Sequence, residues 1–166
     1  MSIRPKIETA LAATAERLSP GSGPEVVRHL KNDLATIDAS SENLSRRYAN
    51  DDVAVAVPAI FEAKHPEGDP VTVGKRHEGL IVAFSDSLVF VRGVGFGARE
   101  VKALSKNEVS VEKVTMVLDG VNVPGLRVAD RGGRPQFAVA VALPDHQSEL
   151  TAQEALRDEI CALFAG

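Results

Sequence analysis

The sequence predicts an α+β fold, mainly antiparallel β, in which helices precede and follow a set of strands. Apolar residues recur at helical spacing over the first fifty residues and again after residue 150. Between these segments lie seven short strand-like runs separated by turn-forming residues. Two of them, GLIVAF and LVFVRG, are largely continuous apolar runs, and apolar residues alternate in the others. We therefore expect a helical region over residues 1–50 and a β-domain with a C-terminal helix over residues 51–166.

The first fifty residues are predicted to form a helical hairpin. The first helix covers residues 3–18, and the segment SPGSGP at 19–24 breaks the chain. A second helix follows to residue 48, with apolar residues spaced by three and four as in a heptad seam. The seam residues are Val27, Leu30, Leu34, Ile37 and Leu44. Two interpretations stay open: packing on the neighbouring helix or the β-domain, or a self-association seam that makes the protein a homo-oligomer.

Seven strands are predicted after residue 51. They cover residues 53–61, 79–84, 88–93, 99–104, 109–118, 121–129 and 136–143. Residues 64–78 form a polar loop between the first two strands, and Ser-Asp-Ser at 85–87 is a short turn. The alternation changes phase near residues 112–113 and 124–125, where we expect β-bulges.

The chain is predicted to end in an amphipathic helix. After Thr151, apolar residues line one face of this helix: Ala152, Leu156, Ile160, Leu163 and Phe164. Such a helix buries its apolar face against the strands and covers an otherwise exposed core.

The stretch GLIVAFSDSLVFVRG, followed by REVKALSKNEVSVEKV, resembles the short bacterial pleckstrin-homology-like (PH-like) domains. The resemblance covers about residues 53–166 and implies a seven-stranded bent sandwich or barrel with a C-terminal capping helix. It also implies a non-catalytic binding or scaffolding module without a cofactor. Some members of the family bind phosphoinositides through basic residues near the first inter-strand loop, where this sequence has Lys64, Lys75 and Arg76.

Composition narrows the classes of function. The net charge is −4, and residues 51–166 hold 17 acidic against 12 basic side chains, so nucleic-acid binding is not expected. The same balance weakens attraction to anionic membranes. The sequence has one cysteine and no apolar stretch of about 18 residues, and its first residues lack a signal-peptide pattern, so we expect a cytoplasmic protein.

The glycine-rich stretch VRGVGFGARE at 91–100 does not match a nucleotide-binding motif. Its spacing is Gly-x-Gly-x-Gly, no helix follows, and the Lys-Ser/Thr pair of a phosphate-binding loop is absent. Two interpretations stay open: a flexible link between strands, or a loop that presents Phe96, flanked by Arg92 and Arg99, to a protein partner.

No enzymatic or metal site is expected. The histidines lack the paired spacing of zinc ligands, and Cys161 lies late in an amphipathic helix, where a thiolate is disfavoured. The sequence therefore predicts a non-catalytic interaction module that binds a protein partner and self-associates through its N-terminal helices. The alternative is a module that binds phospholipid or a membrane surface through Lys64, Lys75 and Arg76.

Overall fold

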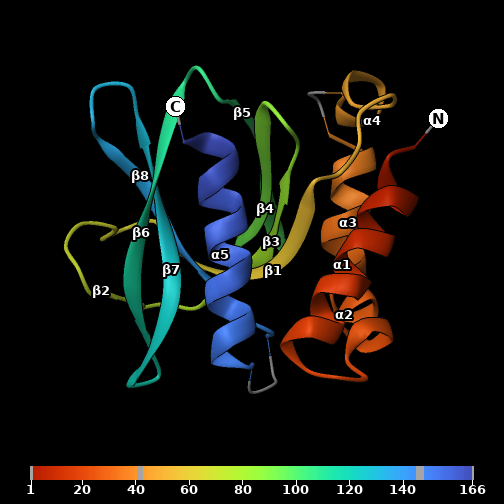
Figure 1. Cartoon of the computed structure of the whole chain (residues 1–166). Helices are drawn as coiled ribbons and strands as arrows, with labels where there is room; N and C mark the ends of the chain where they lie inside the picture. The colour runs from red at the N-terminus through yellow and green to blue at the C-terminus, as the bar shows by residue number, and fades with distance from the viewer. Residues whose placement is uncertain (1, 41–42, 145–147, 166) are drawn as a thin grey trace.

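The computed structural model, which describes residues 2–40, 43–144 and 148–165, confirms the α+β class (Figure 1). The helices are α1 (Arg4–Leu18), α2 (Gly23–His29), α3 (Lys31–Asp38), α4 (Leu44–Arg47) and α5 (Leu150–Phe164). The strands are β1 (Val55–Glu62), β2 (Val71–Thr72), β3 (His77–Ala83), β4 (Ser87–Gly95), β5 (Ala98–Ser105), β6 (Val109–Leu118), β7 (Val121–Asp130) and β8 (Pro135–Val141).

All described strands form one curled sheet. Their order is β2-β6-β7-β8-β1-β3-β4-β5, and every pair is antiparallel except β2 with β6. The seven predicted strands are present, and the sheet gains β2 from the segment that the sequence indicated as a loop. β5 forms one edge of the sheet, and the two-residue strand β2 forms the other.

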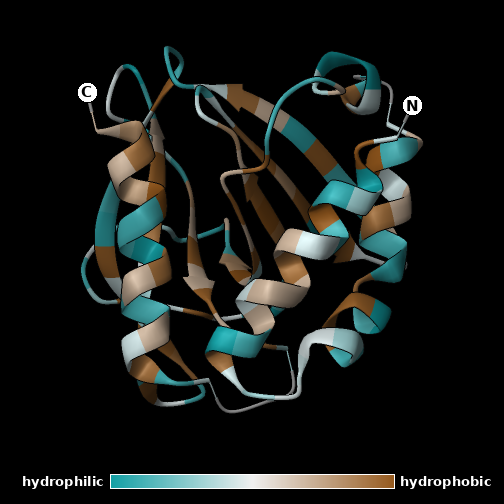
Figure 2. Ribbon diagram, turned by 45° about the vertical axis from the view of Figure 1, so that its right-hand side comes forward, coloured by the Kyte–Doolittle hydropathy of each residue, from teal (hydrophilic) through white to brown (hydrophobic). Residues whose placement is uncertain are grey.

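Helices cover the sheet from both sides (Figure 1). α5 lies on the inner face, where its Asp158 pairs with Lys113 of β6 at 3.1 Å. α2 and α3 lie on the outer face, where His29 and Asp33 pair with Glu78 and Arg99. The middle strands are therefore hydrophobic on both faces, and Figure 2 shows them as mostly brown between helices of mixed hydropathy.

The second N-terminal helix is broken, which corrects the predicted hairpin. α2 ends at His29, α3 runs from Lys31 to Asp38, and α4 begins at Leu44, while residues 41–42 lie outside the described residues. The seam residues Leu30, Leu34, Ile37 and Leu44 are buried and Val27 is half-buried, all in one hydrophobic cluster with α1 and the sheet. Packing within the chain therefore accounts for this apolar pattern, and self-association stays a prediction.

The phase change in β6 and β7 has a different cause from the predicted bulges. The two strands pair without interruption from Val109↔Asp130 to Leu118↔Val121. The first half of β6 buries Val109 in the core beneath α5, whereas the second half buries Val114 and Met116 against Val71 of β2. The apolar pattern slips by one residue because the buried face of the strand changes, not because a residue is inserted.

Candidate functional site

The turn between β4 and β5 projects from the sheet. β3 pairs with β4 only as far as Gly79↔Arg92, so residues 93–98 continue as a two-stranded ribbon with a bulge between Gly93 and Gly95. Gly95 pairs with Ala98, which leaves Phe96 and Gly97 as the two turn residues. Their φ angles are +55° and +75°, the combination that defines a type I′ turn.

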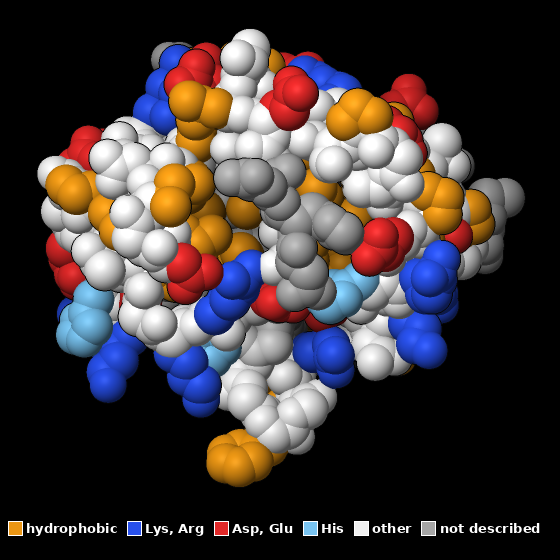
Figure 3. Space-filling view, turned by 90° about the horizontal axis from the view of Figure 1, so that it is seen from below, with side chains coloured by type: hydrophobic (Ala, Val, Ile, Leu, Met, Phe, Trp, Pro, Cys, Tyr) orange, Lys and Arg blue, Asp and Glu red, His pale blue; other side chains and the backbone are white. Residues whose placement is uncertain are grey.

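Phe96 is wholly exposed at this turn, with a relative accessibility of 110%. Val94 (41%), Val121 (60%) and Leu150 (54%) are the other exposed large hydrophobic side chains among the described residues. All four belong to the end of the molecule formed by the β4–β5 and β6–β7 turns and the start of α5, which we call the hairpin end. Figure 3 views the molecule from below and shows cationic and histidine side chains across this end, with a hydrophobic group projecting from it.

The two arginines that flank Phe96 are engaged within the chain. Arg99 Nε donates to Asp33 Oδ1 at 2.9 Å, and its second nitrogen donates to the Gly97 carbonyl at 3.0 Å. Arg92 donates to Glu100 Oε2 on the neighbouring strand at 2.7 Å. These guanidinium groups therefore hold the ribbon in place and leave Phe96 as its projecting side chain.

Asp33 is the buried member of the Arg99 pair, since its side chain is only 8% exposed on α3. Burial raises the pKa of Asp33, and the nearby Arg99 guanidinium opposes that rise. His29 also lowers the pKa of this carboxyl, whereas Glu78 raises it. The Asp33 carboxyl group therefore lies buried on the outer face of the sheet, next to Arg99 at the base of the projecting ribbon.

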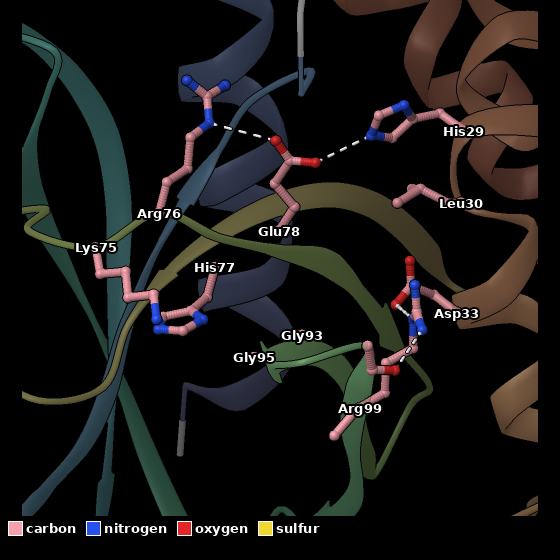
Figure 4. A pocket seen from close by; sticks show the side chains of 12 residues that line it. His29, Leu30, Asp33, Lys75, Arg76, His77, Glu78, Gly93, Gly95 and Arg99 are labelled. Atoms are coloured by element: carbon pink, nitrogen blue, oxygen red, sulfur yellow. Dashed lines mark hydrogen bonds and ion pairs between the residues drawn. The ribbon is translucent and has the colours of Figure 1, made fainter.

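A hollow of about 330 Å³ separates α2 and α3 from the ribbon (Figure 4). Its floor includes Gly93, Gly95 and Gly97, and its wall includes Lys75 and Glu78. Glu78 joins His29 at 3.0 Å and Arg76 at 3.4 Å, so both carboxylates of the hollow have cationic or histidine partners. Gly93 has an ordinary φ and an added Cβ would meet only the Glu78 carbonyl at 3.8 Å, so glycine here leaves space open.

A second hollow of about 560 Å³ adjoins the first and is more cationic. Its lining residues are Glu62, Ala63, Lys64, His65, Gly74, Lys75, His77 and Arg92. Lys64 and Lys75 thus share one hollow, as the lipid alternative requires, and neither forms an ion pair with another described residue. Arg76 instead contacts Glu78, Asp119 and the Pro144 carbonyl.

Glu62, which lines the same hollow, forms no ion pair with these two lysines. It is buried, and its carboxylate accepts hydrogen bonds from the backbone N–H groups of Lys64, His65 and Gly74 at 2.8–3.0 Å. Burial by itself raises the pKa of Glu62, but the three donors together outweigh it and hold the pKa below its usual range. Glu62 therefore stays ionised and orders the loop that carries β2.

The structure places Phe96 at an exposed turn and Lys64 and Lys75 in one hollow, and sequence reasoning missed the polar contacts beneath the turn. Asp33 lies on α3 and His29 on α2, and their partners follow 66 and 49 residues later in the chain, respectively. No group of three or more metal-ligating side chains occurs in the described part of the chain. Within the same residues, no helix combines the length and apolar character needed to span a membrane.

Comparison with known proteins finds similarity in structure only. No protein-family model matches the chain, and no curated protein sequence matches it. The chain is similar to a Slm1 PH domain solved in complex with phosphoserine, with 11% identity and a TM-score of 0.44 over 69% of this chain and 97% of that domain. It is also similar to the DH/PH domains of p115-RhoGEF, with 14% identity and a TM-score of 0.42 over 87% of this chain and 41% of that chain.

Proposed function

We propose that this chain is a binding module that recognises a protein partner through the β4–β5 hairpin, with Phe96 as the central contact. Phe96 supports this proposal because it breaks two local preferences at once. A bulky residue in the left-handed region costs about 1–2 kcal/mol, and its exposed ring contributes no burial in return. A position that is costly for the fold is expected where the side chain serves recognition.

The charges of the hairpin end favour a protein over a lipid surface as the partner. Three of its arginines are already paired with carboxylates of the same chain: Arg76 with Asp119, Arg92 with Glu100, and Arg99 with Asp33. Among the described residues that line the second hollow, Lys64 and Lys75 are the lysines without an ion pair, and each is worth about 1 kcal/mol at an anionic membrane. An exposed aromatic side chain on a projecting turn is by contrast a common feature of protein interfaces.

Site-specific photo-crosslinking tests this proposal. A photoreactive phenylalanine analogue is placed at position 96 and, as a matched control, at position 119, the equivalent position of the β6–β7 turn. We expect a light-dependent adduct with a discrete protein from position 96 in cells that express the chain, and none of that mass from position 119. The absence of a protein adduct at position 96, or the same adducts from both positions, would contradict the proposal.

Binding of an anionic lipid headgroup is the second candidate function, favoured by the two unpaired lysines of the second hollow. Sedimentation with vesicles containing phosphatidylserine tests it, with a Lys64→Glu/Lys75→Glu double variant. If lipid binding is the function, the wild type sediments at low salt and the variant loses about tenfold in affinity or more. Lys31→Glu/Lys102→Glu, which alters exposed lysines away from the hollow, is the matched control for net charge.

A further inference from the structure

The projecting ribbon has little support of its own. Beyond the pair Gly79↔Arg92 it consists of two strands without a neighbour, and three of its six residues are glycine. Two strands alone are marginally stable in water, and glycine has more conformational freedom to lose than other residues. An aromatic side chain at the tip of such a ribbon keeps one direction only if something outside the ribbon holds it.

Arg99 provides that connection. It lies at the base of the ribbon and contacts two elements with one planar group: Nε donates to Asp33 Oδ1 of α3, and another nitrogen donates to the Gly97 carbonyl of the turn. A guanidinium presents its donors in a fixed fork, so these two contacts couple the turn to the helix. In Figure 4, Asp33 and Arg99 meet at the side of the hollow between α3 and the ribbon.

The acceptor side of this contact is also rigid. Asp33 is almost fully buried, and its neighbours Leu30, Leu34 and Ile37 pack in the main hydrophobic cluster. A second polar contact, between His29 of α2 and Glu78 of β3, connects the N-terminal helices to the sheet close to the ribbon. The N-terminal helices are thus a fixed platform behind the β4–β5 turn.

We propose that Asp33 and Arg99 are positioning residues, through which the N-terminal helices fix the direction in which the hairpin presents Phe96. This inference rests on the proposed function for its purpose, but the mechanical coupling is measurable without a partner. It assigns the first fifty residues a role in the binding site itself. It also assigns Arg99 an internal role rather than contact with the partner.

A single tryptophan can report on the coupling, because the sequence has none. In a Phe96→Trp background, time-resolved fluorescence anisotropy separates fast local motion at the turn from tumbling of the whole protein. Asp33→Asn is expected to raise the amplitude of the fast component at least about twofold, the contrast between rigid and flexible backbone. Asp52→Asn, an exposed carboxylate outside this contact, is the matched control and leaves the decay unchanged.

Arg99→Lys is the second variant, in case Asp33→Asn unfolds the protein. Lysine keeps the charge opposite Asp33 but loses the fork that also reaches Gly97, so the fast component is expected to rise while the melting temperature stays near that of the wild type. An unchanged anisotropy decay in a folded Asp33→Asn or Arg99→Lys protein overturns the inference. Unchanged crosslinking from position 96 in the Asp33→Asn variant overturns it as well.

The outcomes for the coupling and for the proposed function are separable. A raised fast component with no protein adduct at position 96 supports the coupling and contradicts the proposed function. A protein adduct from position 96 of the wild type, together with an unchanged anisotropy decay in folded Asp33→Asn, supports the proposed function and contradicts the coupling.

Discussion

The β4–β5 and β6–β7 turns have the same backbone geometry but opposite chemistry. Both are two-residue turns, with φ of +55° and +75° at Phe96 and Gly97 and of +51° and +78° at Asp119 and Gly120. Asp-Gly is among the pairs that this turn type prefers, since a short polar side chain tolerates the left-handed region. Phe-Gly satisfies the requirement at the second position only.

The side chains of the two turns also differ in their contacts within the chain. Asp119 contacts Arg76 of the same chain at 3.1 Å, so its side chain serves the internal structure as well as the turn. Phe96 is fully exposed, and its turn is held from behind by Arg99. Folding requirements explain the aspartate at residue 119, whereas they do not explain an exposed aromatic side chain at residue 96. This difference is why the proposed binding site is placed at one turn and not at the other.

The largest expected effect tests whether the two turns share their geometry. Gly97→Val and Gly120→Val should each lower the free energy of unfolding by about 2 kcal/mol, because a β-branched residue is strained at positive φ. An added Cβ meets nothing within 4 Å at either site, so the cost is one of backbone strain. Urea denaturation measures both, with Gly132→Ala as a control at ordinary φ. A cost at position 120 but none at position 97 would show that the β4–β5 turn is not held as described.

Substitutions at the first turn position, to a polar residue in one turn and to an aromatic residue in the other, should give smaller effects of opposite sign. Phe96→Asn is expected to raise the free energy of unfolding by about 1 kcal/mol, since asparagine accepts the left-handed region, and Asp119→Phe to lower it by a similar amount. The same denaturation curves measure both changes. Stability that falls on Phe96→Asn would mean that the aromatic ring serves the fold, and the contrast between the turns would then disappear.

The smallest expected effect is a pH dependence of the free energy of unfolding that arises from Asp33, next to the β4–β5 turn. Because burial raises the pKa of Asp33 in the folded state, its contribution to stability is present at acid pH and declines as pH rises from about 3.9 through the raised value. Arg99, His29 and Glu78 are the charged and titratable groups that act on it. Denaturation at a series of pH values should show this decline in the wild type and not in Asp33→Asn.

Glu62 provides the control of opposite sign for that measurement. Its lowered pKa gives a contribution that is present above about 4.3 and lost as pH falls through the folded-state value. The stability difference between wild type and Glu62→Gln should therefore shrink under acid conditions. A Glu62→Gln variant that behaved like Asp33→Asn would contradict the assignment of the two carboxylates to different environments.

Much of the fold could be predicted because it follows from local periodicity. Apolar residues, alternating in most strands and continuous in β3 and β4, identified β1 and β3 to β8, and a stripe with helical spacing identified α5. The same reading misplaced the cause of the phase change in β6, where Val109 and Val114 face different partners. It also joined α2, α3 and α4 into one helix. The apolar spacing of Leu30, Leu34 and Ile37 shows that they are buried on a common side, but it does not show that the helix is continuous.

The sequence indicates candidate site residues only where a single residue stands out from its neighbours. Phe96 between glycines is visible in the sequence, as are Lys64 and Lys75. The contact between Asp33 and Arg99 is not, because neither residue has a local partner that would mark it. Arg76 was grouped with the lysines by its position in the chain, yet its guanidinium turns to Asp119 and Pro144.

The sequence by itself determined the class of fold, the strands and the turn that presents an aromatic side chain, since these depend on neighbours a few residues apart. Only the tertiary structure decided which face each strand buries, where the N-terminal helices pack, and that Arg99 supports the turn from α3. Those features arise from contacts between residues far apart in the chain, and such contacts leave no period in the sequence.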